Sequence, residues 1–264
     1  MLDVAIFTAL GWERRAVTGA LRATLPGAEP GTWEGHLGDG TSCRVVQTGI
    51  GRERARSAAA AAPPVRLFLA CGCAGGLAPW LRAGDLVLAE RVDVVDAEGR
   101  TAGRIDAQGA ALAGWAANSG FRVHRGAIAS TLAALDTAHA KTVAGASGAL
   151  VVEMESAAVA AEARARGIPF VGLRVVLDHA GQALPLPPGV IDERTGEIRT
   201  GRAIAGLSAR PWLWPALGRL ARQGRVAERS LHAFMAALFR EGGMEMLLGP
   251  AAPAAAAGGA KEAF

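Results

Sequence analysis

Two glutamates stand where an apolar segment gives way to a helical one, in the run Val151-Val-Glu-Met-Glu-Ser-Ala-Ala-Val159. The valines favour a buried segment, and the small residues after Ser156 favour a closely packed helix. A carboxylate in the first turn of a helix is stabilised by the positive end of the helix, so a structural role would explain both Glu153 and Glu155. We nevertheless expect one of the two to work on a ligand.

Two further acids follow apolar strands. Val4 to Leu10 predicts a buried strand with Glu13 just after it, and Pro169 to Val176 predicts another with Asp178 at its end. Ligands of α/β proteins bind at the carboxyl ends of strands. On the residues alone, Glu13 could equally be a solvated helix charge and Asp178 a cap on a turn.

Arg174 interrupts the second of these strands. A buried arginine is costly unless it is paired, and Glu153 or Glu155 is the expected partner. The pairing would tie the glutamate segment to the strand that ends at Asp178.

Glycine-rich turns follow two other predicted strands. Cys43 to Thr48 leads into Gly49-Ile-Gly51 and a helix from Arg52 to Ala62, and the strand Val65 to Ala70 runs into Cys71-Gly-Cys-Ala-Gly-Gly76. This β-α-β order predicts a parallel pair with a right-handed crossover. Glycine lets backbone N–H groups approach a ligand closely. Neither turn has the spacing of an ATP or a dinucleotide loop.

The rest of the chain completes one α/β domain over residues 1–248. We expect a helix from Asp106 to Asn118, a strand from Phe121 to Ala129 and a polar, mobile connection from Lys141 to Gly148. A helical extension begins at about residue 202, with separate helices divided by Pro211, Pro215 and Gly224. Residues 249–264 have no periodicity and are expected to be a disordered tail.

Composition excludes several classes of protein. With 264 residues, 51% hydrophobic content and 35 glycines, the chain is typical of a folded protein with many tight turns. No run approaches the ~20 apolar residues of a membrane span, and Val4 to Leu10 lacks the basic flank of a signal peptide, so we expect a cytoplasmic protein. The arginines crowd the last quarter, where they could attract an anionic surface; we expect no nucleic-acid partner.

The cysteines and histidines suggest neither a disulfide framework nor a metal. Cys43, Cys71 and Cys73 are an odd set without complete zinc spacing, and we expect them to be buried small residues. The five histidines show no helical metal spacing. We therefore predict no metal and no cofactor.

Taken in order, these segments resemble the nucleoside phosphorylase superfamily, and within it the 5′-methylthioadenosine/S-adenosylhomocysteine nucleosidases. The matching segments are Thr48 to Gly51, Gly72 to Leu77 with Gly84-Asp85, Val152 to Glu155, and Arg174 to Asp178. The resemblance implies a three-layer α/β/α fold around a central mixed, mostly parallel twisted sheet. It also implies a homo-oligomer in which a neighbour completes the pocket.

The resemblance also implies roles for individual residues. Glu13 would activate the attacking water, Glu155 would hold the ribose hydroxyls, and Asp178 would protonate the adenine leaving group at N7. The remaining substrate-binding residues that it implies are Gly72, Cys73, Ala74, Gly75, Val152 and Met154. Gly72 and Gly75 would leave room for the nucleoside, and Met154 would lie under the sugar.

These residue types suit cleavage of an N-glycosidic bond. The reaction builds an oxocarbenium-like sugar and an anionic base, so the site needs an acid at the base and a negative group near the sugar. A carboxyl acid at neutral pH needs a raised pKa, which a buried apolar strand end before Asp178 would provide. Three positions depart from the family pattern: Leu177 and Cys73 replace serines, and Glu13 stands where a run of glutamates is usual.

A finer resemblance is to the hopanoid-associated phosphorylases. It rests on Met154 to Ala157, on Asp178-His-Ala180 followed by Leu184-Pro, and on a C-terminus rich in tryptophan and arginine. It implies that adenosylhopane is cleaved to ribosylhopane and adenine in hopanoid biosynthesis. The C-terminal helices would then make peripheral contact with a membrane.

Three alternatives stay open. Phosphate could replace water, with Arg44, Arg52 and Arg54 as contacts, although Ala70-Cys71 stands where the family's phosphorylases carry a phosphate-binding arginine. The substrate could instead be methylthioadenosine, S-adenosylhomocysteine or a futalosine-like nucleoside. The third alternative is a non-catalytic protein that binds a nucleoside at the membrane periphery.

Overall fold

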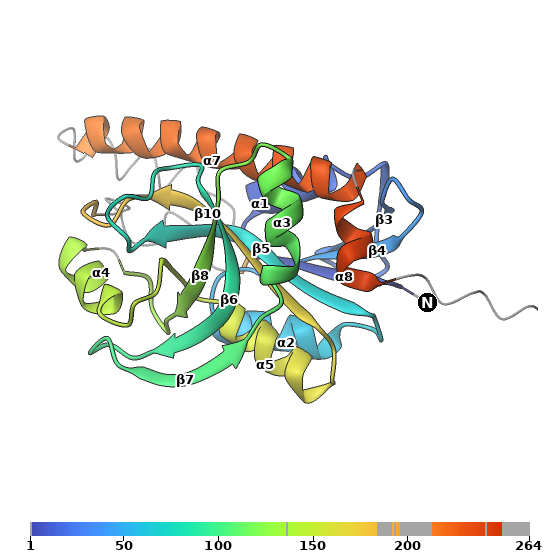
Figure 1. The fold of residues 1–264 in the computed structure, drawn as a ribbon, viewed down its shortest axis with the longest axis horizontal. Helices are drawn as coiled ribbons and strands as arrows, with labels where there is room; N and C mark the ends of the chain where they lie inside the picture. Colours follow the sequence, from blue (N-terminus) through green and yellow to red (C-terminus); the bar gives the residue numbers. More distant parts are fainter. Residues whose placement is uncertain are drawn as a thin grey trace, which may run out of the picture.

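The chain folds around one ten-stranded mixed sheet with helices on both faces (Figure 1). The computed structural model describes residues 2–135, 137–183, 192, 194–195, 213–240 and 242–249. The strands are β1 (Val4–Thr8), β2 (Ala23–Pro26), β3 (Thr32–His36), β4 (Ser42–Gln47), β5 (Leu67–Gly76), β6 (Leu86–Val95), β7 (Thr101–Asp106), β8 (Val123–Ser130), β9 (Val151–Glu153) and β10 (Phe170–Asp178). The helices are α1 (Gly11–Thr18), α2 (Arg52–Ala61), α3 (Ala110–Asn118), α4 (Ala138–Gly145), α5 (Ser156–Ala165), α7 (Trp214–Arg240) and α8 (Gly243–Leu248).

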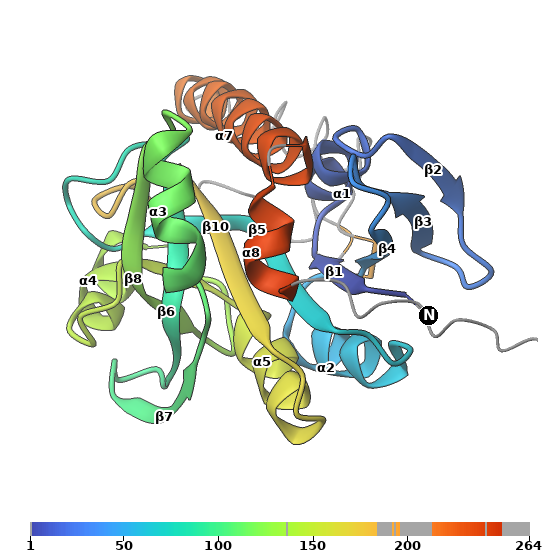
Figure 2. The same ribbon diagram turned by 45° about the vertical axis from the view of Figure 1, so that its right-hand side comes forward.

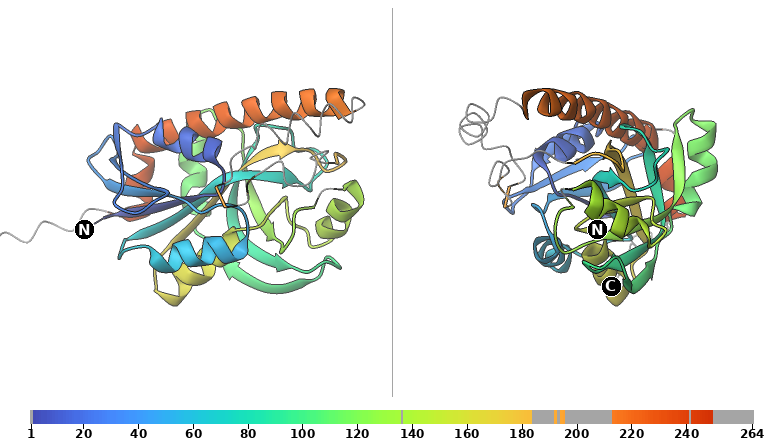
Figure 3. Two further views of the ribbon diagram at one scale, coloured as in Figure 1. Left: turned by 180° about the vertical axis from the view of Figure 1, so that it is seen from behind. Right: turned by 90° about the vertical axis from the view of Figure 1, so that its left-hand side faces the viewer.

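The helices form a layer on each side of the sheet. Helices α1, α3, α7 and α8 cover one face, and α2 and α5 lie side by side on the other (Figures 1 and 2). The view from behind in Figure 3 shows α7 running along the length of the molecule above the sheet. The predicted α/β architecture with a central mixed sheet between helical layers is confirmed.

The pattern of strand β1 explains the three layers. All five of its residues are buried. Val4 and Ile6 pack into the cluster shared with α1 and α7, whereas Ala5 and Phe7 pack into the cluster shared with α2 and α5. A strand apolar on both faces must be covered on both, since burying one Val, Leu, Ile or Phe side chain contributes roughly 1.5–3 kcal/mol.

Part of the sheet closes into a ring, a feature that the sequence pattern did not predict. Strand β5 pairs with β10, β10 with β6, β6 with β8, β8 with β9, and β9 returns to β5. The interior of the ring is filled by small and branched side chains, Ala74, Val87, Ala89, Ile128, Val151 and Val176. Because β6, β8 and β9 run opposite to β5 and β10, closure needs two antiparallel contacts. Antiparallel pairs are therefore as frequent as parallel ones over the whole sheet.

Two predicted elements differ in the structure. The connection from Lys141 to Gly148 begins inside helix α4, whose first turn is capped by the Thr137 hydroxyl accepting from Ala140 N at 3.1 Å. The helix predicted from Asp106 starts only at Ala110, because Asp106 still belongs to β7, which pairs with β6. The spacing of hydrophobic residues alone did not locate the boundary between strand β7 and helix α3.

The C-terminal helices predicted to be divided at Pro215 and Gly224 form one continuous helix, α7, of 27 residues. Pro215 lies in its first turn, where a missing N–H costs nothing, and Gly224 faces Leu177 at the end of β10. The apolar face of α7 packs into the cluster of α1 and β10, which supports our proposal of one domain over residues 1–248. The predicted start at residue 202, Pro211, Leu184-Pro and the tail beyond Gly249 lie outside the described residues.

Among the residues that the structure describes, no helix is both long enough and apolar enough to cross a membrane.

Candidate active site

A pocket of about 200 Å³ lies where β1, β5 and β10 end and where β9 turns into α5. All but one of the predicted site residues line it: Glu13, Cys73, Ala74, Gly75, Val152, Met154, Glu155 and Asp178. Glu153 and Lys141 line it as well, together with apolar side chains from Leu10, Ile50, Leu135 and Leu177. Segments far apart in the sequence therefore meet at one cavity.

Glu13 is held by three backbone N–H groups. Its Oε2 accepts from Ala9 N and Leu10 N, both at 2.9 Å, and its Oε1 accepts from Cys73 N at 2.7 Å. The side chain is buried. The three donors fix the direction of the carboxyl group. Oε2 accepts two of them and Oε1 accepts one, so Oε1 keeps a lone pair for a water molecule.

Gly72, the predicted site residue that does not line the pocket, makes room for Glu13. A Cβ built on Gly72 would lie 2.7 Å from the Glu13 carboxylate carbon and both of its oxygens. The expectation that Gly72 leaves space for the nucleoside is therefore wrong, since the space is taken by a catalytic candidate. Gly75 differs: its Cβ would contact Lys141, Val152 and Asp178 at 3.3 to 3.5 Å.

Glu155 is tied to the turn after β4. Its Oε1 accepts from Gly51 N at 2.7 Å, and Gly51 has a φ of 102°, which only glycine adopts easily. Burial raises the pKa of Glu155 to about 7, and the nearby Glu153 charge adds to the shift. The glycine turn thus positions Glu155.

Glu153 is the partner of Arg174, which confirms one of the two pairings considered. Arg174 Nη2 donates to Glu153 Oε2 at 2.5 Å and to Ser156 Oγ at 2.7 Å. The same Oε2 accepts from the backbone N of Glu155 and of Ser156, at the start of α5. Glu153 therefore compensates a buried arginine and fixes the turn that presents Glu155.

Asp178 is paired with Lys141, a residue that the sequence did not single out. Lys141 Nζ donates to Asp178 Oδ2 and, at 3.4 Å, to the His179 carbonyl oxygen. Both side chains are 1% exposed. Asp178 Oδ1 is buried and has no hydrogen-bond partner in the described part of the chain.

The surroundings of Asp178 are therefore not the apolar ones predicted from Val176 and Leu177. Lys141 Nζ instead places a hydrogen-bond donor on Asp178 Oδ2. Burial lowers the pKa of Lys141 to about 8. No local sequence pattern marks this lysine, which begins the segment predicted to be a polar connection, 37 residues before its partner.

The prediction of three buried cysteines holds for Cys43 and Cys71, whereas Cys73 is partly exposed at the pocket. Burial raises the pKa of Cys43 and of Cys71 to about 12, and burial together with the Glu13 charge holds the pKa of Cys73 well above its usual range. Since the thiolate is the nucleophile, Cys73 acts as a small neutral wall of the pocket. Over the described residues, no group of three His, Cys, Asp or Glu side chains could hold a metal ion.

The three arginines considered for phosphate have different surroundings. Arg44 pairs with Glu34 at 2.6 Å, and Arg54 Nη1 donates to the Ile50 carbonyl at 3.1 Å. Arg52, the first residue of α2, has buried Nε and Nη2 atoms without a partner among the described residues. Arg52 is thus the one of the three whose buried donors have no partner among the described residues.

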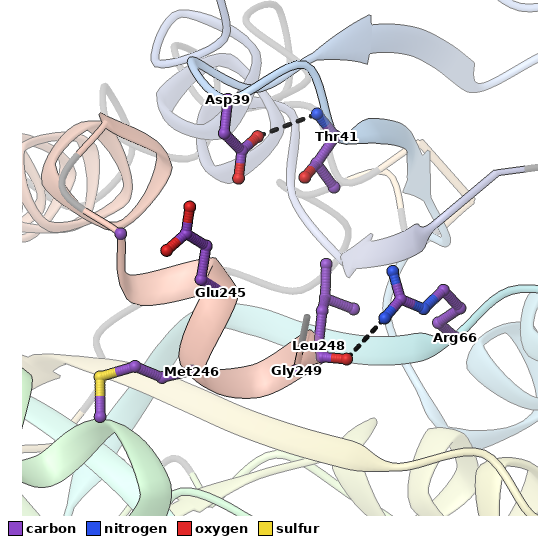
Figure 4. Close-up of a pocket in the computed structure, with 8 residues that line it drawn as sticks. Asp39, Thr41, Arg66, Glu245, Met246, Leu248 and Gly249 are labelled. Atoms are coloured by element: carbon purple, nitrogen blue, oxygen red, sulfur yellow. Dashed lines mark hydrogen bonds between the residues drawn. The ribbon is translucent and has the colours of Figure 1, made fainter. Parts of the chain in front are cut away.

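A second, larger cleft of about 630 Å³ lies between α8 and the start of β5 (Figure 4). Its polar groups bind the protein itself: Asp39 accepts from Thr41 N at 2.9 Å, and Arg66 donates to the Leu248 carbonyl at 2.6 Å. Arg66 precedes β5, so the cleft lies at the amino end of that strand. The candidate acids lie at the opposite end, which makes the smaller pocket the candidate active site.

Comparisons with known proteins agree with this fold. Solved structures that superpose on the chain include the Neisseria meningitidis 5′-methylthioadenosine/S-adenosylhomocysteine nucleosidase with methylthio-immucillin-A. The superposition has a TM-score of 0.68 at 19% sequence identity, and it covers 91% of this chain and 99% of the Neisseria chain. The Streptococcus pyogenes S-adenosylhomocysteine nucleosidase gives 0.61 at 23% identity, covering 68% and 85%. Futalosine hydrolase of Helicobacter pylori gives 0.61 at 22%, covering 69% and 86%.

At these identities the likeness establishes the fold. Among curated proteins no significant match was found. The model of one family, described as the phosphorylase superfamily, matches residues 3–195, a span that contains every predicted site residue. The chain therefore belongs to the phosphorylase superfamily.

Proposed function

We propose that the protein is a nucleosidase that hydrolyses the N-glycosidic bond of an adenine nucleoside. The observation that carries this proposal is the gathering of Glu13, Glu155 and Asp178, from three separate segments, around one pocket of about 200 Å³. The adenine nucleosidases among the superposed structures support the same chemistry.

The roles follow from how each carboxylate is held. Glu155, fixed by the Gly51 N–H, accepts hydrogen bonds from the ribose hydroxyls. Glu13, fixed by three N–H groups, orients a water molecule and takes its proton as the water attacks C1′. Asp178, which lines the same pocket at the end of β10, binds the base through its unpaired Oδ1, and this part of the pocket is the base end. Cys73, Ala74, Gly75, Val152 and Met154 form the walls between them.

Water is the proposed nucleophile rather than phosphate. Ala70 and Cys71, which stand where the family's phosphorylases carry an arginine, are buried in the core. Arg52 has unpaired donors but is not among the residues that line the pocket. Phosphorolysis remains the second candidate because of Arg52, and an Arg52→Gln variant would lose any stimulation by phosphate.

For the 5′ substituent we propose the apolar hopanoid chain of adenosylhopane, which gives ribosylhopane as the second product. The pocket is lined by Leu10, Ile50, Leu135 and Leu177, and Leu132, beside the lining residue Thr131, is 70% exposed. Such a surface suits an apolar substituent better than the charged amino-acid tail of S-adenosylhomocysteine.

The experiment is adenine release from a panel of nucleosides by the purified protein, with and without phosphate. The panel contains adenosylhopane, methylthioadenosine, S-adenosylhomocysteine and futalosine. We expect phosphate-independent release, fastest from adenosylhopane. Faster release from a soluble nucleoside would replace the hopanoid assignment while leaving the nucleosidase intact. Binding of the nucleosides without release from any of them would favour the non-catalytic alternative.

Peripheral membrane contact and self-association belong to the same proposal. The apolar face of α7 is used for packing within the chain, so the outer face offers Arg219, Arg222, Arg225 and Arg229 to an anionic surface. Co-sedimentation of this cytoplasmic protein with anionic vesicles should weaken with salt and on replacement of these arginines. A homo-oligomer would appear as twice the chain mass or more in light scattering, and a monomer would contradict it.

A further inference from the structure

We propose that Lys141 gives the departing adenine its proton, and that Asp178 acts as the acceptor that holds both the lysine and the amino group of the base. This inference rests on the proposed function and reassigns one of its steps. It adds a residue from α4 to the chemistry of a site otherwise built from strand ends and the start of α1.

Lys141 is placed at the base end of the pocket by its neighbours. The side chain is 1% exposed, lines the cavity, and lies against Gly75: a Cβ on Gly75 would be 3.3 Å from Lys141 Cε and 3.5 Å from Asp178 Oδ1. The glycine thus keeps space for the ammonium and the carboxylate side by side. A buried lysine destabilises the fold unless its charge is paired, and here the partner is Asp178.

The two oxygens of Asp178 are not equivalent. Oδ2 accepts from Lys141 Nζ, while Oδ1 is buried without a partner among the described residues. The pair therefore offers a ligand one acceptor next to one cationic donor. The edge of adenine offers the reverse, an amino donor at N6 beside an acceptor at N7. When the edge of adenine is paired with these two groups, its amino group donates to Asp178 Oδ1 and its N7 accepts from Lys141 Nζ.

The proton balance favours the lysine as the acid. In the hydrogen bond between Lys141 and Asp178 the ammonium is the donor and the carboxyl oxygen is the acceptor, so the proton available to the base is on Lys141. As the C1′–N9 bond breaks, its electron pair moves to the base and a proton passes from Nζ to N7, so that neutral adenine and neutral lysine remain. Water adds to C1′ and loses its proton to Glu13. Solvent exchange then removes the proton from Glu13 and returns one to Lys141.

The pH dependence follows from the same groups. Burial lowers the pKa of Lys141 to about 8, so the ammonium is charged at neutral pH yet gives up its proton more readily than an exposed lysine. The titratable groups that share its pocket are Glu13, Cys73, Glu153, Glu155 and Asp178, and His139 on α4 is exposed. Turnover of an adenine nucleoside should therefore fall above about pH 8.

The test compares two leaving groups in wild type, Lys141→Met and Lys141→Arg. One substrate is the best adenine nucleoside of the panel, and the other is p-nitrophenyl ribofuranoside, whose phenolate leaves without a proton. Removing a general acid typically costs about 10²–10⁴-fold. We expect Lys141→Met to lose that factor in adenine release while nitrophenol release stays within a few-fold of wild type.

Lys141→Arg separates the acid from the ion pair. Arginine keeps the charge beside Asp178 but does not give up a proton in proteins, so KM for the adenine nucleoside should return towards wild type while kcat stays low. Equal losses on both substrates, or wild-type adenine release by Lys141→Met, would overturn the role. If the wild-type protein cleaves nitrophenyl riboside and no adenine nucleoside, the proposed function fails instead. Thermal unfolding of each variant checks that it is folded.

Discussion

The two ends of the pocket are built in different ways. At the sugar end, Glu13 and Glu155 are held by backbone N–H groups of neighbouring turns. At the base end, Asp178 of β10 is held by one side chain, that of Lys141 on helix α4. Backbone N–H donors do not titrate, and most point substitutions leave them in place. An ammonium group can lose its proton, and a point substitution can remove it. With the roles proposed above, the sugar end is a fixed receptor for charge, and the base end is where a proton can move.

The largest expected effect comes from the base end. Asp178→Asn removes the charge that retains the Lys141 ammonium and weakens the acceptor for the base, so adenine release should fall by about 10²–10⁴-fold. Steady-state kinetics on the best substrate of the panel measures it. The matched control is Asp106→Asn, an exposed acid at the end of β7, which should keep wild-type activity. Undiminished activity in Asp178→Asn would contradict the assignment of this end to the base.

A smaller but substantial effect is expected when the sugar end is disturbed through the backbone. The Cβ of Gly72→Ala would lie 2.7 Å from the Glu13 carboxylate and displace it from its three donors. We expect kcat to fall by at least about 10-fold, and overpacking of this kind typically costs about 1–3 kcal/mol of stability.

The control for that change is Gly114→Ala in α3. No heavy atom stands within 4 Å of the new Cβ, and alanine in a helix interior is favoured by roughly 0.5–1 kcal/mol. Its melting temperature should therefore stay level or rise, with activity unchanged. If Gly72→Ala behaved like Gly114→Ala, the position of Glu13 would not matter to the reaction.

The contrast between the ends also marks what the sequence could predict. Strand ends, glycine turns and the burial of Arg174 are local patterns. They marked Glu13, Asp178 and the segment of Glu153 and Glu155 as candidates, with either glutamate as partner of Arg174, and the family resemblance supplied the individual roles. Lys141 contacts a residue 37 positions away, and no periodicity records such a contact. The closure of the sheet into a ring is likewise a matter of long-range pairing, as between β5 and β9. The role of Gly72 could not be read locally, because the side chain that needs its space comes from α1.

Glu155→Gln should have an intermediate effect, centred on binding. A hydrogen bond to a charged group contributes about 1.5–3 kcal/mol, so KM for a ribosyl substrate should rise by about 10-fold or more while kcat changes less. Because the pKa of Glu155 is raised to about 7, the carboxylate is lost as pH falls through 7, and wild-type KM should rise there too. The variant should lack that pH dependence.

The raised pKa of Glu155 also makes the stability of the protein depend on pH. Between its usual value of 4.5 and about 7, the folded protein keeps a proton on Glu155 that the unfolded chain has lost. The free energy of unfolding should therefore fall as pH rises across this window, and Glu155→Gln should remove that contribution. Denaturant unfolding at several pH values measures it, with the exposed Glu53→Gln as control. A slope that is unchanged in Glu155→Gln would show that another group is responsible.

The smallest expected effect concerns how the base end is attached to α7. The amides of Gln182 and Gln223 bond to each other reciprocally at 2.9 and 2.8 Å, which ties the segment after Asp178 to the helix. Neutral hydrogen bonds contribute about 0.5–1.5 kcal/mol each, so Gln223→Ala should lower stability by about that much. The base end is held by side chains, so losing this contact should shift its groups, whereas the sugar end is held by the backbone. We therefore expect kcat to fall about two- to three-fold, in line with an energy of this size. KM for the ribosyl group should be unchanged. An effect confined to KM would mean that α7 serves substrate binding and leaves the Lys141–Asp178 pair undisturbed.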